Sequence, residues 1–358
     1  MFATVTTALR SRTGIALLAV SFAAIVLVLS PWAQGPALPL GSIDFPTSGT
    51  PEAQEEFTIG VLALHSFWYE EARDHFLQAQ RLDPSFGMAH WGLAMTYDNA
   101  LRTTPGLANE EFGETVVASM DELDREGGLS WTARERGYRD AIRERFRPGR
   151  PPDERRRVYA GAMDQLALEF PNDDEANVFA ALSFLALPTF DRDNPLHVVT
   201  VASILEEVYE RNREHPGALH YLIHAYDTAT FARMGLRQAR IYAQIAPASS
   251  HALHMPSHIF RHLGMWDEVA SSNEASWQAS ADWQERTSRP LSARDYHALD
   301  WMLAAYVNLE RYEDAERVMD EIDTIEEEIE RRGEAPGNFP PIANSMRAYY
   351  QSEVPPVQ

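Results

Sequence analysis

Apolar residues recur every three to four positions along most of the chain, and the pattern breaks at proline and glycine. This spacing is typical of amphipathic α-helices, whereas the strict alternation of a β-strand is scarce. The helical pattern runs from about residue 53 to about residue 350. We therefore expect an all-α body over 53–350, followed by a short tail at 351–358.

The N-terminal region has a different pattern. Residues 13–30, TGIALLAVSFAAIVLVLS, are uncharged and apolar, and they follow Arg10 and Arg12. This order predicts a signal peptide or signal anchor at 1–30, with the body exported, either periplasmic or tethered to a membrane. Residues 31–52 are rich in Pro, Gly and Ser, which predicts a linker.

The predicted body contains a repeat of 34 residues. The unit at 53–86 resembles the tetratricopeptide repeat (TPR), with Gly60, Ala72, Phe76, Ala79 and Pro84 at its positions 8, 20, 24, 27 and 32. Further units fit from 87 and from 296, with weaker copies at 174–207, 216–249 and 250–283. Longer segments interrupt the array at 100–150, expected to be loop-rich with helical pieces, and at 284–295. The resemblance implies an α-solenoid, a TPR-like helical array.

Three longer motifs narrow the resemblance. They are HPGALHYLIHAYD at 215–227, HALHMPSHIFRHLGMWDE at 251–268 and YHALDWMLAAYVN at 296–308. They resemble the signatures of a group of bacterial exported TPR proteins. This resemblance implies a fold rather than an activity.

Polar residues gather on one face of the first helices of the later units. In TPR arrays, which this chain resembles, positions 2, 5, 9, 12 and 13 line the concave groove, and positions 4, 7, 8 and 11 pack inside. The groove positions hold histidine or aspartate nine times in the three units from 216, 250 and 296. These residues are His220, His224, Asp227, His251, His254, His258, His262, His297 and Asp300. In the first two units, His65 and Trp91 take groove positions.

The histidine spacing predicts a candidate metal site. His-x3-His, as at 220/224 and 254/258, places two imidazoles one helical turn apart, and packed helices lie roughly 8–10 Å apart. The predicted ligands are His220, His224, His254, His258 and His297, and imidazole suits Zn, Cu, Ni or Fe. Asp227 or Asp300 would be a further ligand or would orient one.

Some of these positions are expected to differ from the rest. His251 and His262 lie at the ends of the histidine stripe and are expected to face solvent. Pro256 lacks an N–H, so it predicts a kink or a late helix start. A helix that began only at Pro256 would leave His251 and His254 on the preceding turn and weaken the stripe.

Several functions fit this pattern. The main hypothesis is an exported scaffold that binds a peptide, protein or small ligand in a histidine-rich groove. The alternative is a metal-binding protein or metal-dependent hydrolase, and a pH sensor is a third reading. The chain contains no His-Glu-x-x-His, Gly-x-Ser-x-Gly or phosphate-loop motif, so no named enzyme class is indicated.

Composition excludes other classes. The chain has 53 acidic and 31 basic residues, all of the latter arginine, for a net charge of −22 with neutral histidine. Such a charge repels phosphate backbones, which argues against a nucleic-acid partner. The chain has no cysteine, so disulfides, thiolate metal ligands and a cysteine nucleophile are excluded.

Overall fold

The computed structural model describes residues 38–101 and 110–355, which belong to one compact unit, Leu38–Gln358. The apolar segment predicted at 13–30 lies outside these residues. Among the helices of the described ranges, none is both long enough and apolar enough to cross a membrane.

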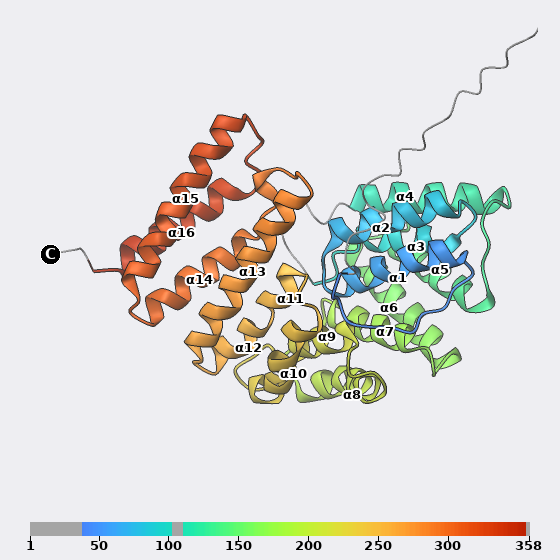
Figure 1. The fold of residues 1–358 in the computed structure, drawn as a ribbon. Helices are drawn as coiled ribbons and strands as arrows, with labels where there is room; N and C mark the ends of the chain where they lie inside the picture. Colours follow the sequence, from blue (N-terminus) through green and yellow to red (C-terminus); the bar gives the residue numbers. More distant parts are fainter. Residues whose placement is uncertain (1–37, 102–109, 356–358) are drawn as a thin grey trace, which may run out of the picture. The chain divides into compact units, whose positions relative to one another are not determined.

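The described chain is built of α-helices with one 3₁₀ turn, and its β-structure is limited to an isolated bridge between Phe86 and Ser130 (Figure 1). The predicted all-α class is therefore confirmed. In order, the helices are α1 (Pro51–His65), α2 (Tyr69–Leu82), α3 (Gly87–Met95), α4 (Glu110–Arg125), α5 (Ala133–Arg145), α6 (Pro152–Glu169), α7 (Asp174–Leu185), α8 (Pro195–Arg211), α9 (Pro216–Tyr226), α10 (Ala232–Ile245), α11 (Ser250–His254), α12 (Pro256–His262), α13 (Trp266–Arg286), η2 (Leu291–Ala293), α14 (Tyr296–Asn308), α15 (Tyr312–Arg332) and α16 (Phe339–Glu353).

Helices that follow one another in sequence pack against one another. The pairs α1–α2, α7–α8, α9–α10 and α14–α15 each coincide with a predicted repeat unit, and each pair is in contact. In the unit from 250, the first helix is divided into α11 and α12, and both pack on α13. Helix α9 also contacts α1, which lies far away in sequence. The repeat array is thus formed by helix pairs that stack on their neighbours.

The first repeat shows why small residues stand at fixed positions. The Phe76 ring of α2 lies against Gly60 of α1 and Gly92 of α3, all within the core. A Cβ atom added to Gly60 or Gly92 would lie 2.7 or 2.4 Å from Phe76 Cε1, well inside van der Waals contact. Glycine therefore lets three helices approach one aromatic ring.

Residues 38–50, within the predicted linker, form no helix but lie against the helical body. Leu40 and Phe45 are buried, and the Ser42 amide donates to the Glu214 carbonyl 3.1 Å away. The Phe45 ring lies 6.2 Å from that of Trp91 and 5.3 Å from that of Tyr138, centroid to centroid. This segment covers the helix faces that an open array would leave to solvent.

The longer segments between repeats add helices and a short turn. Residues 100–150, apart from 102–109, contain α4 and α5, with buried Arg145 of α5 bonded to Asp98 and Glu110. The segment 284–295 holds the end of α13 and η2. Helix α16 continues to Glu353, into the predicted tail.

Candidate metal centre

The helices that carry the predicted site residues begin at capping side chains. His215, Ser249 and Asp295 precede α9, α11 and α14, and each accepts a hydrogen bond from the backbone amide three residues later. Such caps satisfy amides that have no partner within the helix and define where it starts. Pro256 begins α12 after a break at Met255, whose backbone stays helical. The helix is therefore interrupted at the predicted position, and His251 and His254 remain on a helix.

Six histidines from these helices form two groups of three. The inner triad is His220 and His224 of α9 with His251 of α11. The outer triad is His254 of α11, His258 of α12 and His297 of α14. In each triad, one ring nitrogen per residue lies within 4.8 Å of the corresponding nitrogens of the other two. Both triads therefore bring imidazoles together from different repeats.

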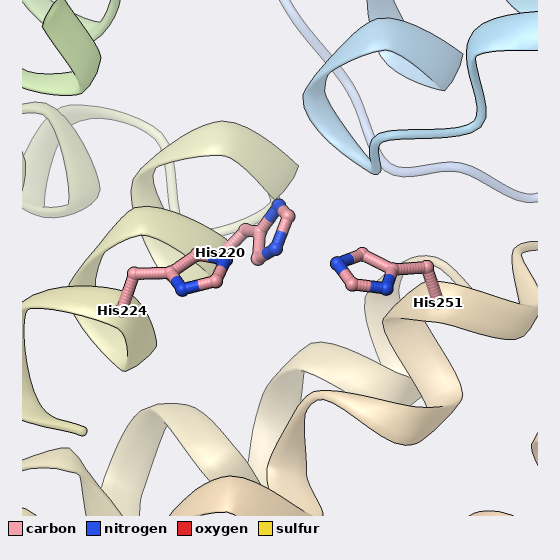
Figure 2. A group of neighbouring side chains, drawn as sticks. All are labelled: His220, His224 and His251. Atoms are coloured by element: carbon pink, nitrogen blue, oxygen red, sulfur yellow. The ribbon is translucent and has the colours of Figure 1, made fainter. Parts of the chain in front are cut away.

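The inner triad lies in the protein interior. The ring of His220 lies 4.8 Å from that of His224 and 5.0 Å from that of His251, centroid to centroid. Figure 2 shows His251 approaching from α11 opposite the two α9 side chains. His220 is fully buried, and its Nδ1 lies 2.6 Å from the backbone oxygen of His65. A carbonyl only accepts, so His220 carries its proton on Nδ1 and directs the Nε2 lone pair toward its neighbours.

His254 of the outer triad is oriented in the same way. Its Nδ1 lies 2.6 Å from Asn273 Oδ1, and the Asn273 side-chain amide donates to the Val269 carbonyl at 2.7 Å. The second bond identifies which Asn273 atom is oxygen, so Nδ1 of His254 is the donor. Its Nε2 atom is therefore an acceptor in the neutral ring.

Asp227, at the end of α9, orients the third ring. Asp227 Oδ2 lies 2.9 Å from Nδ1 of His258, and Oδ1 lies 3.1 Å from Nε2 of His262. Burial by itself would raise the pKa of Asp227, but the hydrogen bond from His258 and nearby cationic groups hold it below its ordinary value. Because the carboxylate is ionised, the Nδ1 of His258 donates to it, leaving Nε2 as the second acceptor.

The two acceptor nitrogens face each other. The Nε2 atoms of His254 and His258 are 3.1 Å apart. Two lone pairs at this separation repel unless a proton or a metal cation lies between them. Two imidazole ligands of one tetrahedral zinc ion would be about 3.3 Å apart, given bonds of about 2.0–2.1 Å. This geometry is close to that of a ligand pair.

In a third cluster, the carboxylate of Glu175 links His65 and His215. Glu175 accepts from Nε2 of His65 at 2.6 Å and from Nε2 of His215 at 3.1 Å, and all three residues are buried. The other ring nitrogens accept from Tyr221 Oη and from the Ala218 amide. Each ring nitrogen and the carboxylate thus have a protein partner. This network joins α1, α7 and α9 structurally. Its ligand atoms also lie close enough together to hold a metal ion, but each is already hydrogen-bonded to another protein group.

The structure divides the residues predicted as one metal site. His220 and His224 belong to the inner triad, while His254, His258 and His297 belong to the outer triad. Asp227 orients His258 and holds His262, which is partly buried. Asp300 bonds to neither triad and lies beside a separate cavity.

Three expectations about exposure are wrong. His251, expected to face solvent, is only 8% exposed and completes the inner triad. His65 and Trp91, expected in an open groove, are fully buried. The reason is tertiary: Phe179 of α7 packs on both rings, and Phe45 of the N-terminal segment packs on Trp91.

Sequence reasoning missed several residues that complete these sites. Asn273 on α13 and the backbone oxygen of His65 orient two triad rings, and Glu175 satisfies the third cluster. A backbone oxygen has no sequence signature. His215 could have been placed at the cap, because Pro216 marks the first position of a helix.

Comparison with known proteins gives little further information. No protein-family model and no curated protein matches the chain. Among solved structures, the chain is similar to one described as the TPR2AB-domain:pHSP90-complex of yeast Sti1, with 12% identity and a TM-score of 0.30, over 85% of this chain and 99% of that chain. The fold assignment therefore rests on the helices themselves.

Proposed function

We propose that this protein binds divalent transition-metal ions at the inner and outer triads. The observation that carries the proposal is the pair of Nε2 atoms of His254 and His258, 3.1 Å apart, with both Nδ1 atoms committed to acceptors. Acceptors at Nδ1 are the usual partners of metal-bound histidines, since they hold the tautomer and the ring orientation. The His65 carbonyl has the same relation to His220.

All-imidazole triads favour particular metals. Imidazole suits Zn²⁺, Cu²⁺, Ni²⁺ and Fe²⁺, and the absence of cysteine leaves no thiolate for softer ions. Three protein ligands are the number found in catalytic zinc sites, which keep a fourth position for water or substrate. His297 is solvent-exposed, so the outer triad is the one that solvent reaches. Metal-dependent hydrolysis therefore stays a prediction for the outer triad.

Burial argues against direct peptide contact by three of the six triad histidines. His220 and His254 are fully buried, and His251 nearly so. A peptide in a concave groove needs exposed contact residues. A scaffold role with a protein partner remains a prediction for other surfaces of the array. Export, with membrane tethering through residues 1–30 and membership of the bacterial exported TPR group, also remains a prediction.

The test is metal analysis of the full-length chain, purified in detergent and reconstituted with Zn²⁺ after chelation. We expect about two ions per chain, one for each triad. The double variant His220→Ala/His224→Ala should lose one ion, and so should His254→Ala/His258→Ala. His75→Ala/His197→Ala is the matched control, because both residues lie outside the triads.

Separate controls distinguish loss of metal binding from loss of folding in the variants. Since His297 is exposed, His297→Ala should weaken binding at the outer triad without disturbing the core. Helical circular dichroism of each variant would identify misfolding. Wild-type protein that retains its helical spectrum but binds no Zn²⁺, Cu²⁺ or Ni²⁺ would contradict the proposal.

A further inference from the structure

A cavity of about 400 Å³ lies beside the outer triad. Its volume is within the range of small-molecule sites, about 300–1,000 Å³. Helices α12, α13, α14 and α16 line it. The lining includes Arg261, Trp266, Asp300, Trp301, Asn308 and Tyr349.

Helix α14 joins the cavity to the outer triad. His297, Trp301, Ala304 and Asn308 are spaced four, three and four residues apart, so they lie on one face of the helix. The Trp301 ring lies 4.6 Å from the ring of His258 and 5.5 Å from that of His297, centroid to centroid. Trp301 is therefore the wall between the cavity and the outer triad.

Arg261 brings a positive charge to the cavity. Its guanidinium carbon lies over the Trp301 ring, 4.7 Å from the ring centre, and this cation–π contact does not use the N–H groups as hydrogen-bond donors. Arg261 forms no ion pair with any residue of the described ranges. Arg145, in contrast, is bonded to two carboxylates. Planar N–H edges of this kind match a carboxylate with two parallel hydrogen bonds.

Asp300 brings a negative charge to the same cavity. Within the described part of the chain, no arginine pairs with it and no donor hydrogen-bonds to it. Burial raises its pKa. Burial also raises the pKa of Tyr349, another lining residue, and the charges of Glu353 and Asp300 raise it further. A carboxylate in this setting gains from a ligand ammonium group, which would replace the water lost on burial.

We propose that this cavity binds a small zwitterion, an α-amino acid with an apolar or aromatic side chain. The ligand carboxylate would bind the N–H edges of Arg261, and its ammonium group would bind Asp300. The side chain would pack against Trp266 and Trp301. Two opposite charges in one cavity that do not pair with each other favour a ligand that carries both. This site is additional to the metal-binding function proposed above and does not depend on it.

The experiment is calorimetric titration of the full-length chain with L-phenylalanine, after a thermal-shift screen of the standard amino acids. N-acetyl-L-phenylalanine lacks the ammonium charge, and L-phenylalaninamide lacks the carboxylate. We expect each blocked compound to bind about tenfold or more weakly than the zwitterion. Equal affinity for free and blocked compounds would overturn the proposal, and so would the absence of binding by every amino acid screened.

Two variants test which residue binds each charged group of the ligand. In Asp300→Asn, the preference for phenylalanine over its N-acetyl derivative should disappear. In Arg261→Gln, the preference over the amide should disappear. Arg240→Gln and Asp282→Asn are matched controls at exposed positions away from the cavity. If Asp300→Asn and Arg261→Gln keep the wild-type preference for L-phenylalanine over its blocked derivatives, the amino acid binds outside this cavity and the proposal is overturned.

Measurements with chelator and with Zn²⁺ separate the two proposals. Asp300→Asn should keep the wild-type metal content, because Asp300 bonds to neither triad. Wild-type protein that binds Zn²⁺ but none of the amino acids would overturn only the zwitterion site. Wild-type protein that binds an amino acid but no Zn²⁺, Cu²⁺ or Ni²⁺ would overturn only the metal function.

Discussion

At the scale of single residues, proton positions decide what the histidines can do. His220, His254 and His258 each donate from Nδ1 to an oxygen that only accepts. All three therefore present Nε2 lone pairs toward neighbouring rings. His65 and His215 instead donate from Nε2 to Glu175. The same residue type thus serves two purposes, distinguished by its hydrogen-bond partners.

Asp227→Asn tests the orienting role of the carboxylate. The neutral amide would lose the charge-assisted bonds to His258 and His262, so we expect zinc affinity at the outer triad to fall about 10- to 100-fold. Competition with a chromophoric chelator measures this affinity. Exposed Asp282→Asn is the control. An unchanged affinity would mean that Asp227 has no influence on a metal.

Glu175→Gln tests the third cluster. An amide cannot accept from both His65 and His215 as an ionised carboxylate does, so we expect the free energy of unfolding to fall on the order of 3 kcal/mol. Urea denaturation of the metal-free chain measures this loss. Zinc stoichiometry should stay at the wild-type value, because the ring nitrogens and carboxylate oxygens of this cluster are already hydrogen-bonded within the protein.

Stability of the metal-free chain should also fall on acidification. Burial, partly offset by Glu175, lowers the pKa of His65 below 6.5, so the unfolded chain binds more protons as pH falls below 6.5. Burial alone would raise the pKa of Glu175, but the two histidines lower it well below 4.5, so its contribution is lost as pH falls below 4.5. Protonation of His65 and protonation of Glu175 therefore both lower the free energy of unfolding as the pH falls. Melting temperatures that rise from neutral pH toward pH 4.5 would contradict this account.

At the scale of helices, the contact between α9 and α1 depends on a missing side chain. A Cβ atom at Gly217 would lie 2.4 Å from Nδ1 of His65. Glycine therefore lets the first turn of α9 approach the buried imidazole. The same approach brings the His65 carbonyl within reach of His220.

Gly217→Ala should thus destabilise the protein, by about 1–3 kcal/mol for an overpacked contact. It should also weaken metal binding at the inner triad, which the carbonyl of His65 orients. Gly161→Ala on α6 is the matched control, because a Cβ there meets nothing within 4 Å and alanine favours a helix by up to about 1 kcal/mol. Thermal melts of both variants measure these changes in stability. A Gly217→Ala variant more stable than the wild type would contradict the packing argument.

At the scale of the whole molecule, the triads join separate repeats. The inner triad links α9 to α11, and the outer triad links α11 and α12 to α14. A ligand that binds only the folded state stabilises it by mass action. Metal ions at these positions would therefore hold successive units of the array together.

Saturating Zn²⁺ should raise the melting temperature of the whole chain. At free zinc about a hundredfold above the dissociation constant, each site contributes about 2.7 kcal/mol. Differential scanning calorimetry with and without chelator measures the shift, which His297→Ala should reduce. A melting temperature indifferent to zinc would show that the folded protein has no affinity for it.

The all-α class and the placement of the histidines on one face of their own helices could be predicted from the sequence alone. These follow from helical periodicity, which is a local property of the chain. The interruption of the helix at Pro256 was predictable for the same reason, since it follows from one missing N–H.

The division of the histidines into two triads, and the groups that orient them, depend on tertiary packing. The grouping of His251 with His220, and the acceptors on His65 and Asn273, depend on helices distant in sequence. The burial of Trp91 depends on a segment without periodicity, because Phe45 packs across a face that the repeat pattern leaves open. A local pattern determines the direction of a side chain from its own helix, whereas its partners depend on which other helices pack there.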